Sequence, residues 1–277
     1  LGILCLCILN VVIYFGGLIV RPDISIPFCS RWIYNPNRRY EVWRFFTCTL
    51  IHADPFHLIN NMILLLLVGV PLEMYHSTWR TLFVYLIGSV SGSVLVSVID
   101  KKRPLAGASG GVSSLAAAHV ADIALNWTED TIIFRHRLRT NRPARVIKSE
   151  CVRIGRLCII GFIISLDVYN CLRQRYGSSR TGDISYISHV GGAIFGFLVG
   201  YLVLHHHFFR KNNKLIRCLV LIGNLSVWAF MILEHIFNDT EFPPLDPCDL
   251  STFRKECSDK CYKYIPQFNN QCNITFC

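Results

Sequence analysis

Seven apolar stretches, each long enough to cross a lipid bilayer, constrain the fold of this chain more than any other feature. At 1.5 Å per residue, about 20 apolar residues span the hydrocarbon core as a helix. The stretches predict helices over 1–20, 57–75, 79–99, 106–125, 154–172, 184–204 and 215–237. The sequence therefore predicts an all-α polytopic membrane domain over residues 1–237 and a cysteine-rich extramembrane tail over 238–277.

The composition agrees with a membrane protein. Of the 277 residues, 52% are hydrophobic and only 17% are charged, which is unusual for a soluble globular domain. The formal net charge is +10, but the basic residues lie in short loops between the apolar stretches. Lipid headgroups and topology signals explain that placement better than nucleic acid does. We therefore expect contact with the lipid bilayer and no nucleic-acid binding.

The polar insertion over 126–153 sets the expected orientation. Its basic residues include Arg135, Arg137, Arg139, Arg142, Arg145 and Lys148. The positive-inside rule places such a segment in the cytosol. The chain opens on an apolar stretch without an initiator methionine, so we expect a missing, cytosolic N-terminal segment. The tail after residue 237 is then expected on the outer side.

The tail suits an oxidising compartment. Five of the 13 cysteines lie there, namely Cys248, Cys257, Cys261, Cys272 and Cys277. Asn273-Ile274-Thr275 matches the acceptor pattern for N-glycosylation, so we expect disulfides and a glycan on Asn273. Because the tail cysteines are odd in number, one pairs elsewhere, for example with Cys29, or stays free. The tail has no histidine to support zinc binding, and we expect no metal site and no cofactor.

A candidate nucleophile lies in the segment Gly107-Ala108-Ser109-Gly110-Gly111, where a charged loop enters an apolar helix. The free N–H groups and partial positive charge of a helix N-terminus stabilise an oxyanion. The glycines allow a substrate backbone to come close. Small residues in an apolar helix also mark close helix packing, so Ser109 needs a base before it is read as a nucleophile.

His189 is the candidate base. Gly192, Gly196 and Gly200 follow it at helical spacing and predict a groove into which another helix packs closely. The matching stripe of small residues is Ser109, Ser113, Ala116 and Ala117. We therefore expect two helices to approach until the Ser109 hydroxyl meets the His189 imidazole.

Further polar residues gather at the start of the helix predicted over 57–75. Asn61 follows His57 by four positions, on the same helical face. His57, Ser109 and His189 all fall within about two turns of the outer ends of their helices. Polar groups inside a bilayer are costly and usually functional. Scattered polar residues satisfied within the core are the alternative, but a shared depth on three helices favours a single site.

These motifs resemble those of the rhomboid family of intramembrane serine proteases, over nearly the whole chain. The matching segments are Gly107 to Gly110, His52 with His57 and Asn61, Trp43-Arg44, Gly69 to Glu73, and His189 with Gly192 and Gly196. The extra seventh helix is similar to the secretory-pathway branch of animals, whose members release growth-factor precursors. One position departs, because Ser113 stands where the family usually has a tyrosine that stacks on the catalytic imidazole.

The resemblance implies a rhomboid-like six-helix bundle with one extra C-terminal transmembrane helix, and a serine endopeptidase that uses a Ser-His dyad. Ser109 would be the nucleophile and His189 the general base, later the acid. The Ser109 backbone N–H, His57 and Asn61 would form the oxyanion hole.

The resemblance also assigns supporting roles. Gly107 and Gly110 would shape the backbone around the oxyanion hole, and His52 would support it. Trp43-Arg44 would brace the outer loop, and Glu73 would be a capping partner near the inner end of its helix. The expected substrates are single-pass membrane proteins cut near the outer or lumenal face, and the expected location is the Golgi or the plasma membrane.

Two other functions compete with proteolysis. A non-catalytic rhomboid-like adaptor would bind client transmembrane helices without cutting them, but the presence of both Ser109 and His189 favours the enzyme. A channel or transporter is disfavoured because the sequence has no inverted repeat and no acidic residues at mid-membrane. Because Ser113 cannot stack on the imidazole of His189, we expect slow but real proteolysis.

Overall fold

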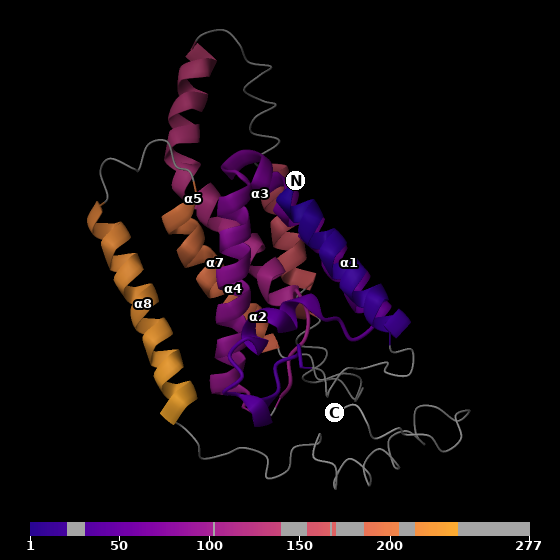
Figure 1. Ribbon diagram of the computed structural model, residues 1–277. Coiled ribbons are helices and arrows are strands. Elements are labelled where there is room, and N and C mark those ends of the chain that lie inside the picture. Colours follow the sequence, from indigo (N-terminus) through magenta and orange to yellow (C-terminus); the bar gives the residue numbers. More distant parts are fainter. Residues whose placement is uncertain are drawn as a thin grey trace, which may run out of the picture.

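The computed structural model is a bundle of long helices (Figure 1). It describes seven ranges of the chain, which are 1–20, 31–101, 103–139, 154–166, 168–169, 186–204 and 214–237. The tail over 238–277 lies outside these ranges, and so do the predictions of its disulfides and of a glycan on Asn273.

The long helices are α1 (Gly2–Val20), α3 (Pro55–His76), α4 (Thr78–Ile99), α5 (Ser109–Arg139), α7 (Tyr186–Val203) and α8 (Lys214–Phe237). Short helical turns are η1 (Pro36–Arg38), α2 (Arg44–Thr47) and η2 (Cys48–Leu50). A further apolar helix covers Ile154–Leu166. Within the described ranges, four helices, α3, α4, α7 and α8, are long and apolar enough to cross a membrane. This confirms the predicted all-α polytopic membrane fold.

Helix α5 differs most from the sequence prediction. It begins at Ser109 and runs to Arg139, whereas a helix over 106–125 and then a polar insertion were predicted. The prediction ended the helix where the apolar residues end. That point marks where a helix leaves the bilayer, but the hydrogen-bonded helix can continue beyond it. Glutamate and arginine are good helix formers in water, so the helix continues into the polar segment.

The centre of the bundle is formed by α4, α5 and α7, which pack against one another. Helix α1 packs on α3 and α4, and α8 packs on α4 and α7, so α1 and α8 lie at opposite edges of the bundle (Figure 1). The fully buried side chains of Leu65, Val84 and Leu115 join α3, α4 and α5 in one core cluster. This core holds rigid the helices that carry the predicted site residues.

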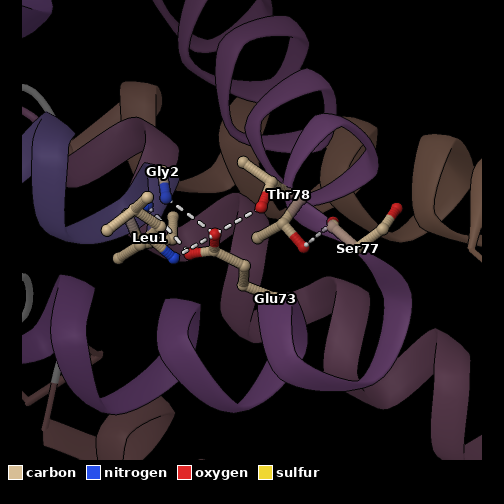
Figure 2. Close-up of polar contacts among 7 residues, drawn as sticks. Leu1, Gly2, Glu73, Ser77 and Thr78 are labelled. Carbon is tan, nitrogen blue, oxygen red and sulfur yellow. Dashed lines mark hydrogen bonds and ion pairs between the residues drawn. The ribbon is translucent and has the colours of Figure 1, made fainter.

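The bundle has two ends with different polar residues. Helices α3, α5 and α7 begin at one end, which we call the Ser109 end, and α4 and α8 finish there. At the opposite end, which we call the Glu73 end, the carboxylate of Glu73 accepts hydrogen bonds from the backbone nitrogens of Gly2 and Ile3 at 2.7 and 2.9 Å. It also accepts one from the Thr78 hydroxyl at 2.6 Å (Figure 2). Glu73 therefore caps the first turn of α1 and ties it to the α3–α4 connection.

A second polar cluster near the Glu73 end was not predicted. The Asp122 carboxylate lies 3.0 Å from His76 Nε2 and pairs with the Arg156 guanidinium. Arg156 Nε donates to His119 Nδ1 at 3.0 Å, and His119 Nε2 donates to the Val68 carbonyl at 2.6 Å. His76, His119 and Asp122 are all buried. The cluster joins α3, α5 and the helix Ile154–Leu166.

Candidate active site

Helices α5 and α7 pack closely along a line of glycines. A Cβ on Gly192 would overlap the Gly110 carbonyl, and one on Gly196 would overlap the Ser114 backbone. A Cβ on Gly200 would lie 3.0 Å from that of Ala118. Gly192, Gly196 and Gly200 therefore line a close contact with α5.

The face that α5 presents to this groove differs by one residue from the prediction. Gly110, Ser114 and Ala118 form the packing line, and all three are buried. Most of the predicted stripe, Ser109, Ser113 and Ala117, is only half-buried and lies on the neighbouring line. Adjacent residues differ by about 100° around a helix, so two parallel lines of small residues cannot be told apart by composition.

The rotation of α5 determines which of its serines are covered by neighbouring helices. A side chain on the packing line is covered by the neighbouring helix, as Ser114 is, whose hydroxyl donates to the Val84 carbonyl at 2.8 Å. Ser109 lies beside the interface at the first residue of α5 and keeps part of its surface accessible. The position of Ser109 beside the interface therefore suits a nucleophile better than the predicted position within the interface.

His189 is placed by its neighbour Ser188. The Ser188 carbonyl would lie 3.3 Å from a Cβ on Gly110 and would overlap one on Gly92, so this turn of α7 is wedged between α4 and α5. His189 is the next residue and is half-buried. Ser109 and His189 are thus each one residue from the point where α5 and α7 meet.

Helix α3 contributes His57 to the same region. Gly107 has φ +128°, and a Cβ there would lie 2.7 Å from His57 Cε1 and 3.0 Å from its Nε2. A side chain at this position is excluded both by the backbone conformation and by the imidazole ring. His57 and His189 are also close enough to interact electrostatically. The start of α3, the segment before Ser109 and the start of α7 therefore converge.

The other predicted support residues lie around His57. Asn61 is buried and its Nδ2 donates to the His57 carbonyl at 2.9 Å, which leaves its second N–H for another acceptor. The rings of His52 and His57 meet edge to face with centroids 5.2 Å apart. Neither ring nitrogen of His52 has a hydrogen-bond partner among the described residues. Burial, followed by the nearby His57, lowers the pKa of His52 to about 3, so the ring is neutral at pH 7.

The segment that leads into Ser109 is held by the residues 31–54, which we call the bracing loop. Tyr34 and Leu105 exchange two backbone hydrogen bonds of 3.0 Å each, and the Gly107 N–H donates to the Cys48 carbonyl at 2.9 Å. This pairing explains why α5 begins at Ser109 and not at residue 106. The backbone before the predicted nucleophile is fixed by the loop, not by the helix.

The loop is itself anchored by Arg44, as the resemblance implied for Trp43-Arg44. Arg44 is buried, with Nη1 donating to the Ile33 carbonyl at 2.9 Å and Nε donating to the Glu41 carboxylate at 2.6 Å. Trp43 is exposed. The brace is therefore the guanidinium, which satisfies both a backbone acceptor and a carboxylate.

Comparison with known proteins agrees with this architecture. The Rhomboid domain family matches residues 39–206. The chain is 36% identical over 218 residues to Rhomboid-related protein 1 of Caenorhabditis elegans, covering 79% of this chain and 55% of the relative. It is 31% identical over 219 residues to Rhomboid-related protein 3 of Homo sapiens, covering 76% and 50%. The chain belongs to the rhomboid family, and it spans about half the length of these curated relatives.

Another relative shows why family membership does not decide the chemistry. The chain is 32% identical over 212 residues to Inactive rhomboid-related protein 2 of Caenorhabditis elegans, covering 76% of this chain and 52% of that protein. A member named as inactive is thus about as similar as members without that label. The choice between a protease and an adaptor has to come from the residues at the Ser109 end.

Proposed function

We propose that this protein is an intramembrane serine endopeptidase that cuts transmembrane segments of single-pass membrane proteins with a Ser109–His189 dyad. The observation that carries the proposal is the α5–α7 contact at Gly110, Ser188 and Gly192. It fixes the backbone beside both dyad residues, and Ser109 and His189 each keep part of their surface exposed, with the His189 Nε2 atom covered. A dyad needs this combination, because the reacting groups must be held in place and still admit a substrate.

The proposed reaction is acyl transfer in two steps. His189 takes the proton of the Ser109 hydroxyl as the oxygen attacks the scissile carbonyl, and then gives it to the leaving amine when the C–N bond breaks. Water, deprotonated by His189, then hydrolyses the acyl-enzyme and frees Ser109. The Ser109 backbone N–H at the start of α5, with the side chains of His57 and Asn61, would stabilise each oxyanion.

The substrate class follows from the position of Ser109 in the bundle. Ser109 is the first residue of α5, so cleavage would occur near one face of the bilayer. A transmembrane helix hides its amides in its own hydrogen bonds, so the scissile segment must unwind, and glycine or other small residues favour this. We place the Ser109 end on the outer or lumenal side in the secretory pathway, where growth-factor precursors are candidate substrates. A decrease in apparent mass after glycosidase treatment of the wild type, absent in Asn273→Gln, would support this orientation.

The second candidate function is a non-catalytic adaptor, favoured by the similarity to a relative named as inactive. The two candidates differ in whether the Ser109 hydroxyl reacts. The decisive experiment treats the purified full chain in detergent with a fluorophosphonate probe and separately with a single-pass reporter.

We expect the wild type to be labelled by the probe and to cut the reporter, and Ser109→Ala to lose both activities by at least about a thousandfold. Ser226→Ala is the matched control, because this serine is exposed on α8 and its hydroxyl donates to the Ile222 carbonyl of its own helix. Reporter that co-purifies uncut, together with no labelling of the wild type, would establish the adaptor instead.

A further inference from the structure

Helix α8 touches the rest of the described chain along one narrow stripe. Its buried residues are Asn224, Met231 and His235, and Trp228 between them packs edge to face on Phe195 of α7 with ring centroids 6.0 Å apart. These four positions of α8 are separated by four, three and four residues, which places them on a single helix face. Most of the helix is exposed, so these four side chains provide most of the packing of α8 on the described bundle.

The stripe ends at His235, which contacts the bracing loop at the Ser109 end. His235 Nε2 donates to the Arg39 carbonyl at 3.0 Å, and Nδ1 lies 2.9 Å from the Ser97 hydroxyl of α4. Arg39 in turn donates from Nη2 to the Ile236 carbonyl at 3.4 Å. His235 and Arg39 are both buried. The loop and α8 are therefore joined in both directions through buried polar groups, which are costly to leave without partners.

A chain of ring contacts continues from His235 to the segment before Ser109. The imidazole meets the Phe45 ring edge to face at 5.2 Å, and Phe45 stacks on Tyr34 at 5.0 Å. Tyr34 exchanges both backbone hydrogen bonds with Leu105, two residues before Gly107. Each link is a direct contact between buried groups, so a displacement of the His235 ring is passed to the backbone that positions Ser109.

We propose that His235 is a positioning residue for the Ser109 site, acting from α8 through Arg39, Phe45 and Tyr34. The inference rests on the proposed proteolytic function. His235 touches no residue of the dyad, and its effect is to hold the bracing loop against Leu105. Loosening that contact lets the Ser109 hydroxyl and its backbone N–H move away from the reacting geometry. A displacement of about 1 Å at a reacting group can reduce turnover about a hundredfold.

The test compares His235→Ala, His235→Gln and Leu233→Ala in the full chain. Leu233 is exposed on α8 two residues from His235 and is the matched control. For His235→Ala we expect kcat on the single-pass reporter and the rate of fluorophosphonate labelling to fall about tenfold, with KM within about twofold. Glutamine keeps an N–H donor for the Arg39 carbonyl, so we expect it to restore at least half of the lost rate.

A second measurement does not depend on catalysis. Hydrogen exchange at the Leu105 and Gly107 amides, which bond to the Tyr34 and Cys48 carbonyls, should become about tenfold faster in His235→Ala and stay unchanged in Leu233→Ala. A wild type without activity would refute the proposed protease while leaving this exchange result to decide the role of His235. Unchanged exchange, a change in KM alone, or a glutamine variant no better than alanine would overturn the inference.

Discussion

The two ends of the bundle both bury polar side chains, but they arrange them differently. At the Glu73 end, Glu73 accepts three or more hydrogen bonds and Asp122 lies between His76 and Arg156. At the Ser109 end, Ser109 and His189 remain half-buried beside the α5–α7 interface. The polar groups at the Glu73 end satisfy one another and hold helices together, whereas Ser109 and His189 are fixed through their backbone and each keeps part of its surface exposed beside the buried His52 and Asn61.

A shared depth of polar residues on several helices does not by itself identify a functional site. Polar residues at one depth on several helices suggested a functional site, and His57, Ser109 and His189 fit that rule. His76 and Asp122 fit it equally well, because they too meet from different helices, and Arg156 completes their network. Shared depth identifies a polar cluster, and the accessibility of its side chains separates a reactive cluster from a structural one.

The largest effect that separates the two ends is expected from Asp122→Ala. The substitution removes the carboxylate that pairs with both His76 and Arg156, and leaves the buried His76 and the partly exposed Arg156 without this acceptor. Leaving a donor without its acceptor costs about 1–3 kcal/mol for each partner. We expect a large fall in the unfolding midpoint in detergent, while the fraction that stays folded reacts with a fluorophosphonate at the wild-type rate.

Asp100→Ala is the control for this substitution. Asp100 lies 3.3 Å from Arg103, and both side chains are partly exposed. An exposed pair contributes about 0–1 kcal/mol, so the two alanine variants should differ clearly in stability. Wild-type stability of Asp122→Ala, or loss of probe labelling in its folded fraction, would show that the assignment of the Glu73 end to structure is wrong.

The next largest effect is expected from Gly192→Ala, which acts on the Ser109 end. The added methyl group would overlap the Gly110 carbonyl, next to Ser109. Overpacking typically costs about 1–3 kcal/mol, and a shift of about 1 Å at Ser109 can lower the labelling rate about a hundredfold. Labelling kinetics with the fluorophosphonate, corrected for the folded fraction, measure this change.

Gly223→Ala separates packing from helix propensity. Gly223 lies on α8, and a Cβ there would have nothing within 4 Å. Replacing glycine by alanine in an open helical position stabilises by up to about 1 kcal/mol, so we expect equal or better stability and unchanged labelling. If Gly192→Ala behaved in the same way, the close α5–α7 contact would not position the dyad.

The difference between what the sequence predicted and what it missed follows from the forces involved. The lengths of α3 and α4 depend on the thickness of the bilayer, so apolar stretches predict them well. The rotation of α5 depends on which of two small-residue lines, Ser109 to Ala117 or Gly110 to Ala118, packs more closely. That choice is made by backbone contacts with α7, and a single sequence does not record it.

The missed cluster and the missed loop pairing have a similar cause. Asp122 and His119 lie three residues apart on α5, a spacing that places them on one helix face and could have signalled a polar contact. Arg156 lies beyond the polar insertion, and nothing local links it to them. The pairing of Tyr34 with Leu105 likewise joins residues far apart in sequence, so it depends on the fold that the helices have already formed.

The smallest effect, and the one that tests the rotation of α5 most directly, is expected from Ser113→Tyr. Ser113 lies on the half-buried line beside Ser109, one residue away from the packing line. A ring there can lie along the α5–α7 interface without entering it, and can stack on the His189 imidazole. We expect kcat on the single-pass reporter to rise about two- to tenfold because the base is better oriented, with stability changed by less than about 1 kcal/mol.

Ser114→Tyr and Ser113→Ala are the controls for Ser113→Tyr. Ser114→Tyr places the same ring on the packing line, where Gly88 and Gly196 leave room only for the serine, and it also removes the hydrogen bond to the Val84 carbonyl. It should destabilise by about 1–3 kcal/mol or more and abolish cleavage. Ser113→Ala should leave the cleavage rate within about twofold of wild type, because we expect the Ser113 hydroxyl to play no part in orienting His189. A strong loss in Ser113→Ala would mean that this hydroxyl orients the base, and equal losses in the two tyrosine variants would mean that α5 is rotated toward Ser113 after all.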